Sequence, residues 1–156
     1  MKVIKAPESQ EPAKEHFSVF LAGSIEQGKA VKWQDKITEM LKDLDVVILN
    51  PRRSDWDDSW DEDIENKQFR EQVEWELDGQ DLATLIIMYF DPATKSPITL
   101  LELGLYAHSG KMIVCCPEGF WRKGNVDIVC KRYDVMQVDS IEVIAQGIKK
   151  AYELSK

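Results

Sequence analysis

The chain has 156 residues, of which 44% are hydrophobic and 31% are charged, and its formal net charge at pH 7 is −8. This length and composition predict a globular protein with a sizeable core. The acidic balance argues against a surface that coats nucleic acid, because such a surface needs clustered lysine and arginine. No run of about 18 apolar residues occurs, so we expect neither a transmembrane helix nor a membrane partner.

The first fifteen residues are polar and lack the apolar core of a signal peptide. We therefore expect residues 1–15 to be a flexible lead-in, residues 16–156 to form a single domain, and the protein to be cytoplasmic. The three cysteines are odd in number, which favours reduced thiols over disulfides. Cys115 and Cys116 are adjacent, which is poor spacing for a metal site, and we expect no metal and no organic cofactor.

Five short apolar runs are typical of buried parallel strands, at residues 16–22, 46–49, 85–90, 112–116 and 135–138. Segments with helical spacing separate or follow them, at residues 26–44, 67–82, 96–110 and 140–154, while 117–130 reads as irregular or as a short helix. This alternation predicts an α/β fold, namely a flavodoxin-like, doubly wound, five-stranded parallel sheet with helices on both faces.

In such a sheet, ligands bind beyond the carboxyl ends of the strands. A glycine and a serine after the first strand can cradle an anion or a sugar hydroxyl, or can simply form a tight turn. The arginine after the second strand can contact a ligand or can pair with nearby aspartates. The substrate-binding candidates in these loops are Gly23, Ser24, Ile25, Asn50, Arg52, Trp56 and Ser96.

The helix predicted at residues 96–110 carries one carboxylate, Glu102, in an almost fully apolar run. Ser96 suits the N-cap and Pro97 the first helical position, while Gly110 suits the residue just past the end. A carboxylate among leucines is unfavourable unless it is paired or functional. Glu102 is therefore the leading catalytic candidate.

Two further carboxylates are candidates for the same pocket. Glu76 lies on the preceding helix, where Glu74 and Asp78 are alternatives, and Asp91 follows the third strand directly. Two carboxyls that face one pocket can divide the chemistry, because one can attack an anomeric carbon while the other moves a proton. Each can equally be an ordinary surface charge or a turn residue. The histidines form no persuasive catalytic set with a serine and an aspartate.

Five motifs together resemble the nucleoside 2-deoxyribosyltransferase family. They are F-L-A-G-S-I at 20–25, N-P-R-R-x-x-W at 50–56, Q-V-x-W-E at 72–76, S-P-I-T-L-L-E-L-G-L at 96–105 and F-W-R-K-G-N-V at 120–126. The resemblance implies a flavodoxin-like fold and a homo-oligomer, a dimer or a multiple of dimers, with shared active sites. It also implies a double displacement at C1′ of a 2′-deoxynucleoside, with a free nucleobase as the second substrate, as in nucleoside salvage.

The same resemblance suggests roles for residues of this chain. Glu102 matches the family nucleophile, and Glu76 matches the carboxylate that orients the nucleophile and moves a proton, where the family often has aspartate; Asp91 is a weaker match. Phe20 stands where many members have tyrosine. Further roles implied for substrate binding are sugar contacts by Ser24, Ser96 and Asn125, the last from a neighbouring subunit, and base contacts by Trp56 and Arg52.

Two alternatives stay open. One is a hydrolase of the N-glycosidic bond of 2′-deoxynucleosides or their 5′-monophosphates. Glu26 and Asn125 stand where a sister group that cleaves monophosphates tends to have arginine and serine, which favours a free nucleoside here. The other is a non-catalytic nucleoside-binding module on the same fold.

Overall fold

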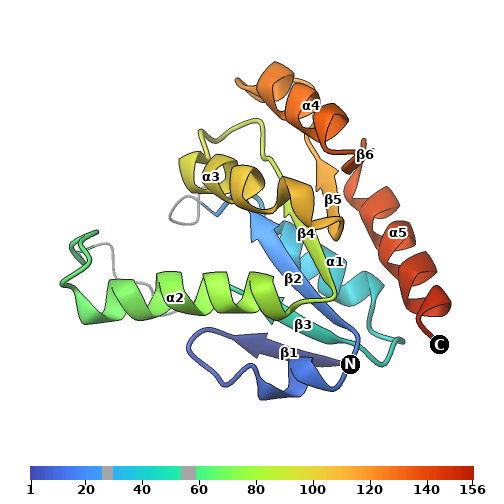
Figure 1. Ribbon diagram of the computed structural model, residues 1–156, viewed down its shortest axis with the longest axis horizontal. Helices are drawn as coiled ribbons and strands as arrows, with labels where there is room; N and C mark the ends of the chain where they lie inside the picture. Colours follow the sequence, from blue (N-terminus) through green and yellow to red (C-terminus); the bar gives the residue numbers. More distant parts are fainter. Residues whose placement is uncertain (26–29, 54–58) are drawn as a thin grey trace.

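The computed structural model describes residues 1–25, 30–53 and 59–156. Its centre is one parallel sheet in the order β1-β3-β2-β4-β5-β6 (Figure 1). The strands are β1 (Lys2–Lys5), β2 (Ser18–Gly23), β3 (Val47–Asn50), β4 (Leu85–Tyr89), β5 (Met112–Cys115) and β6 (Met136–Val138). All five strands predicted from the apolar runs are present, and the α/β fold with a parallel sheet is confirmed.

The sheet has six strands, so the prediction of five was wrong. The additional strand comes from the segment that we expected to be a flexible lead-in: β1 pairs with β3 in parallel, from Lys2 opposite Val47 to Lys5 opposite Asn50. A short 3-10 helix follows at Glu11–Lys14. The segment is also tied to helix α2 (Lys67–Leu82), because Trp75 Nε1 donates to the carbonyl of Glu8 at 2.8 Å.

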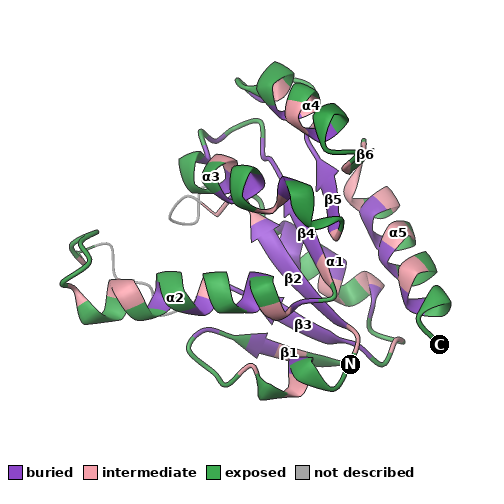
Figure 2. Ribbon diagram, in the orientation of Figure 1, coloured by how far each residue is buried: buried purple, intermediate pink, exposed green. Residues whose placement is uncertain are grey.

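Helices cover both faces of the sheet. One core cluster joins the sheet to α2, α3 (Pro97–Tyr106) and α4 (Lys123–Arg132), and the other joins it to α1 (Trp33–Met40) and α5 (Ile141–Leu154). Figure 2 shows the central strands mostly buried, whereas the helices carry both buried and exposed residues. Alternate residues of each strand enter opposite clusters, as in β4, where Ile86 and Met88 enter the first and Ile87 the second.

The strand order reverses at β2. From β2 the chain crosses to β3 on one side, and from β3 it returns to β4 on the other side. Gly23 ends β2 at this point with φ of +135°, and a Cβ there would lie 2.4 Å from the carbonyl oxygen of Tyr89. Only glycine fits this close approach. The loops that follow β2 and β4 therefore start side by side, at the carboxyl edge where ligands bind in such sheets.

Among the helices of the described residues, α2 is the longest at 16 residues, and none is both long and apolar enough to span a bilayer.

Candidate active site

Glu76 of α2 and Glu102 of α3 lie close enough to repel each other electrostatically. Glu102 is 8% exposed, and burial together with the charge of Glu76 raises its pKa to about 8. Glu76 is half-buried, and burial raises its pKa to about 7. Glu74 and Asp78, the alternatives on the same helix, are exposed. These raised pKa values favour a form of the pair that keeps a proton near neutral pH.

Two glutamines of α2 hold these carboxylates. Gln72 Nε2 donates to Glu76 Oε1 at 2.7 Å, and Gln80 Nε2 donates to Glu102 Oε1 at 2.6 Å. Both glutamines are buried, and they stand one turn before and one turn after Glu76. These bonds stabilise the ionised carboxylates and so oppose the effect of burial on both pKa values.

Neither glutamine is a candidate from the sequence alone. The signal was present, because residues at i−4 and i+4 from Glu76 share its side of a helix. Glutamine is common on exposed helix faces, however. The bond of Gln72 lies within α2, whereas that of Gln80 depends on the packing of α2 against α3.

The far end of α2 is fixed by Lys111, which lies just before β5. Its ammonium donates to the carbonyls of Gln80, Asp81 and Ala83 at 2.7, 2.8 and 3.1 Å. These carbonyls lie at the C-terminal end of the helix, where a cation is favourable. Tyr106 adds a link from α3, since its hydroxyl donates to Asp81 Oδ1 at 2.9 Å. The spacing of the two helices is thus set by polar contacts beside the carboxylate pair.

Three buried hydroxyls lie where β2, the loop after β4 and α3 meet. Ser24 Oγ lies 2.6 Å from Ser96 Oγ, and the hydroxyl of Thr94 lies 3.1 Å and 2.7 Å from these two oxygens. Ser96 stands at the N-cap of α3, as the sequence predicts, but with φ of 47° and without a side-chain capping bond to the helix. Its hydroxyl joins the cluster instead, and thereby ties the start of α3 to the end of β2.

Asp91 is separate from the carboxylate pair. Its Oδ2 accepts the backbone N–H of Val31 at 2.8 Å, and its Oδ1 accepts that of Ala93 at 2.9 Å. Both of its oxygens are therefore engaged by backbone amides, and its charge does not contribute to the pKa of Glu102. This geometry brings Glu76, and not Asp91, together with Glu102.

The loop after β3 begins with two residues predicted to bind substrate. Asn50 is buried, and its Oδ1 accepts the backbone N–H of Arg52 at 3.0 Å, which fixes the turn. The guanidinium of Arg52 donates to the carbonyls of Ala30 and Val31, at 3.3 and 3.2 Å. Arg52 therefore holds the segment that leads into α1. Trp56 lies outside the described residues.

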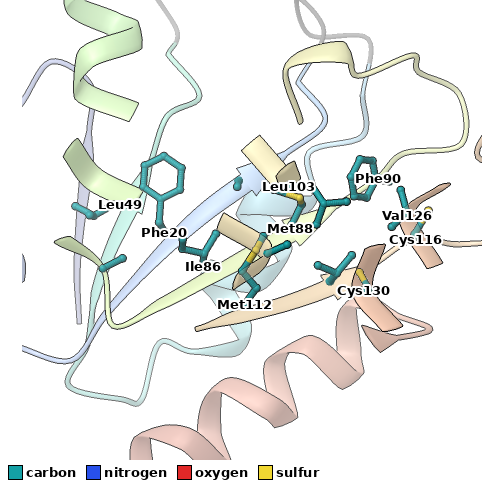
Figure 3. Close-up of a cluster of buried hydrophobic side chains, with 14 of the residues drawn as sticks. Phe20, Leu49, Ile86, Met88, Phe90, Leu103, Met112, Cys116, Val126 and Cys130 are labelled. Atoms are coloured by element: carbon teal, nitrogen blue, oxygen red, sulfur yellow. The ribbon is translucent and has the colours of Figure 1, made fainter. Parts of the chain in front are cut away.

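The remaining candidates lie in different settings. Phe20 is fully buried and points from β2 toward α2, where its ring packs on Trp75 (Figure 3). Ile25 is half-buried after β2. Asn125 is exposed in the first turn of α4, and within the described part of the chain no hydrogen bond joins its side chain to Glu76 or Glu102. The residues described contain no group of three His, Cys, Asp or Glu side chains placed to hold a metal ion.

The fold and the site together define an α/β protein with one parallel sheet and two neighbouring carboxyl groups of raised pKa on α2 and α3. The family described as nucleoside 2-deoxyribosyltransferase like matches residues 16–120, which is more than half of the chain. The chain therefore belongs to the nucleoside 2-deoxyribosyltransferase-like family.

Among solved structures, the chain is similar to that of a conserved protein from Enterococcus faecalis V583. The two are 14% identical, the match covers 87% of this chain and 99% of that one, and the TM-score is 0.62. At this identity the likeness shows the fold alone. A comparison with curated proteins gave no significant match.

Proposed function

We propose that the protein transfers 2-deoxyribose between nucleobases by double displacement, through a covalent deoxyribosyl ester of Glu102. The observation that carries the proposal is the coupling of Glu76 and Glu102, two carboxyl groups whose pKa values are raised to about 7 and about 8. Such a pair holds one proton and one negative charge near neutral pH. Family membership supports a nucleoside-related substrate.

The proton balance of the reaction fits this pair. In the first half, the bond from C1′ to the base nitrogen breaks, the departing base takes the proton of the pair, and a Glu102 oxygen bonds to C1′. In the second half, a nitrogen of the incoming base attacks C1′ and gives its proton back to the pair, while Glu102 leaves as a carboxylate. Glu76 is the proposed site through which the proton passes.

The other candidate residues receive supporting roles in this proposal. The hydroxyls of Ser24 and Ser96 fix the start of α3 and thus the position of Glu102, in addition to the sugar contacts expected of them. Asp91 and Arg52 both bind the backbone of the segment before α1, and so shape the loop that follows β2. The strand order and the helices on both faces support the doubly wound, flavodoxin-like interpretation of the fold.

Exchange between bases is tested with deoxyinosine and free adenine at neutral pH. We expect deoxyadenosine from the wild-type protein and none from Glu102→Gln, and we expect a 2-fluoro-substituted deoxynucleoside to leave a sugar adduct on Glu102 that mass spectrometry detects. Free base and deoxyribose without exchange would identify a hydrolase. Binding without turnover or adduct would identify a nucleoside-binding module.

A second part of the proposal is that the working form is a dimer, or a multiple of dimers. An apolar surface formed by α2 and α3 flanks both carboxylates; its exposed members are Val73, Leu77, Ile98, Leu101 and Leu105. On α3 these residues recur at i, i+3 and i+7, which is one face of a helix. Single exposed apolar residues are ordinary, but several on the two helices that carry the carboxylates favour an interface.

A second copy of this chain is the partner that suits this surface. Two copies of the apolar surface on α2 and α3 can pack on each other across a twofold axis, because such an axis brings the same surface of both copies together. In such a dimer, Asn125 is the residue proposed to complete the neighbouring site. Sedimentation equilibrium measures the stoichiometry, and a monomer at assay concentration would contradict this part.

A further inference from the structure

Gln80 is the fully buried residue of α2 whose amide contacts Glu102. The amide nitrogen donates to Glu102 Oε1 at 2.6 Å and to the backbone carbonyl of Glu76 at 3.3 Å. The amide oxygen, Oε1, has no hydrogen-bond partner among the described residues. The amide nitrogen is therefore hydrogen-bonded, whereas the amide oxygen is buried without a donor from the described residues.

The orientation of the amide follows from its surroundings. Both neighbours of the nitrogen are oxygen acceptors, so the flipped amide would place its oxygen against a carboxylate oxygen and a carbonyl oxygen. Gln80 can thus offer Glu102 only hydrogens, which favours the ionised carboxylate. The backbone of Gln80 is itself held in place, because Lys111 donates to its carbonyl.

Stability alone does not explain a glutamine at this position. A buried carbonyl oxygen without a donor destabilises the folded state, and an apolar side chain of similar length would not carry that penalty. Methionine would fill the space between α2 and α3 with no unpaired polar atom. The amide oxygen is therefore unfavourable for packing, and the shorter of the two bonds of the amide nitrogen is the one to the Glu102 carboxylate.

We propose that Gln80 is a positioning residue that favours the ionised form of Glu102 and fixes its orientation for attack, an inference that rests on the proposed function. Glu76 is the one charged group among the described residues whose field acts on Glu102 from α2, and it opposes ionisation of Glu102. On α3, Tyr106 stands one turn after Glu102, with its hydroxyl bonded to Asp81. Gln80 is the neutral donor that offsets burial and the field of Glu76.

The first test compares wild type with Gln80→Met, which removes the amide, and with Gln80→Glu, which keeps its shape but replaces the nitrogen by oxygen. The readout is the pH profile of kcat/KM for base exchange. Loss of the donor raises the pKa of Glu102, so the acidic limb of the profile moves to higher pH by about one unit. Activity then falls about tenfold at pH 6 and much less at pH 9.

A matched control is Gln137→Met on β6. Gln137 Nε2 also donates to a carboxylate, that of Asp127 at 2.9 Å, but this pair is exposed and lies outside the site. We expect its profile to follow wild type. A Gln80→Met protein whose activity falls by the same factor at every pH, together with a lower melting temperature, would show a merely structural role and overturn the proposal, as would an unmoved acidic limb.

A second test does not depend on turnover. Protein labelled with ¹³C at glutamate side-chain carboxyls is titrated by NMR, and the Glu102 signal is assigned by its loss in Glu102→Gln. We expect that signal to titrate at higher pH in Gln80→Met than in wild type; equal midpoints would overturn the proposal. If wild type exchanges no bases, the proposed function fails, and this titration still decides whether Gln80 controls the ionisation of Glu102.

Discussion

The hydroxyl of Ser24, at the end of β2, lies 2.6 Å from the hydroxyl of Ser96, at the start of α3, although 72 residues separate them in the chain. Thr94 bonds to both, and the Ser24 hydroxyl also accepts the backbone N–H of Asp91 at 2.8 Å. These buried hydroxyls join the sheet to the helix that carries Glu102. The cluster links the fold to the position of a proposed nucleophile.

Replacing Ser24 with alanine should therefore affect both stability and activity. The change leaves the N–H of Asp91 without its acceptor and removes one partner of Ser96, so we expect a loss of about 1–3 kcal/mol in the free energy of unfolding. We also expect lower kcat in the exchange assay, because the start of α3 is less firmly held. Urea unfolding and initial rates measure the two effects. The exposed Ser109→Ala serves as the control, and equal behaviour of the two variants would contradict a positioning role for the cluster.

Glu102 is expected to reduce the stability of the fold as the pH rises. Its folded pKa of about 8 lies above the usual value of 4.5, so the native state binds more protons than the unfolded state between these values. Stability is therefore full below about pH 4.5 and is lost as the pH rises toward 8. We expect Glu102→Gln to match wild type at pH 5 and to unfold at a higher temperature than wild type at pH 9.

A suitable control for this measurement is Glu142→Gln. Glu142 is exposed, and its hydrogen bond to Lys36 lowers its pKa. Removing its charge therefore does not remove an unfavourable buried charge from the folded state. This variant should gain no stability at pH 9. A Glu102→Gln protein that also gains none would mean that Glu102 is not held in a dry environment.

Glu76→Gln tests the proposed division of roles between the carboxyls. Without Glu76 the departing base loses its proton donor, and we expect kcat with deoxyinosine to fall by about 100-fold or more. The loss should be far smaller with 7-methyl-2′-deoxyguanosine, whose cationic base leaves without protonation. Removal of the charge of Glu76 should also lower the pKa of Glu102 and move the acidic limb to lower pH. The exposed Glu74→Gln is the matched control, and equal losses with both nucleosides would contradict a proton-transfer role.

Leu101→Glu tests the proposed dimer. Leu101 is 59% exposed and lies between Ile98 and Leu105 on the apolar surface of α3. The substitution should therefore leave the fold intact while placing a charge in an apolar interface. We expect monomers in sedimentation equilibrium and loss of exchange activity. Ile128→Glu, on α4 and 70% exposed, is the control for a charge added at another exposed apolar position. A Leu101→Glu protein that remains dimeric would place the interface elsewhere.

The strands β2 to β6 were predictable because their segments are apolar runs that differ clearly from their surroundings. The sequence did not predict β1, since Lys2 and Lys5 flank only two apolar residues, and the strand exists because β3 offers it an edge. Pairing with a distant strand leaves little trace in four residues. The local sequence also predicted Ser96 as the N-cap residue of α3. It did not predict that the Ser96 hydroxyl bonds to Ser24 instead of capping the helix, because Ser24 is distant in the chain.

The candidate site was predictable in part for the same reason. Glu102 stood out because a single acid in an apolar helix is a local anomaly, and the structure places it in a buried setting with a raised pKa. Gln80 did not stand out, because its carboxylate partner lies on another helix, and Gln72 did not, because a glutamine four residues before a glutamate is common on exposed helices. The engagement of Asp91 by Val31 also depends on contact between distant segments.

Lys111 donates to three carbonyls at the end of α2, so a chemical modification of its amine would change how the end of this helix is held. Acetylation of Lys111 would remove its charge and two of its three N–H donors. These donors hold the last turn of α2, and one of the carbonyls that they bind is that of Gln80. Monomethylation would keep the charge and leave two donors. We therefore expect a reagent that acylates Lys111 to loosen the end of α2 that carries Gln80, the residue bonded to Glu102.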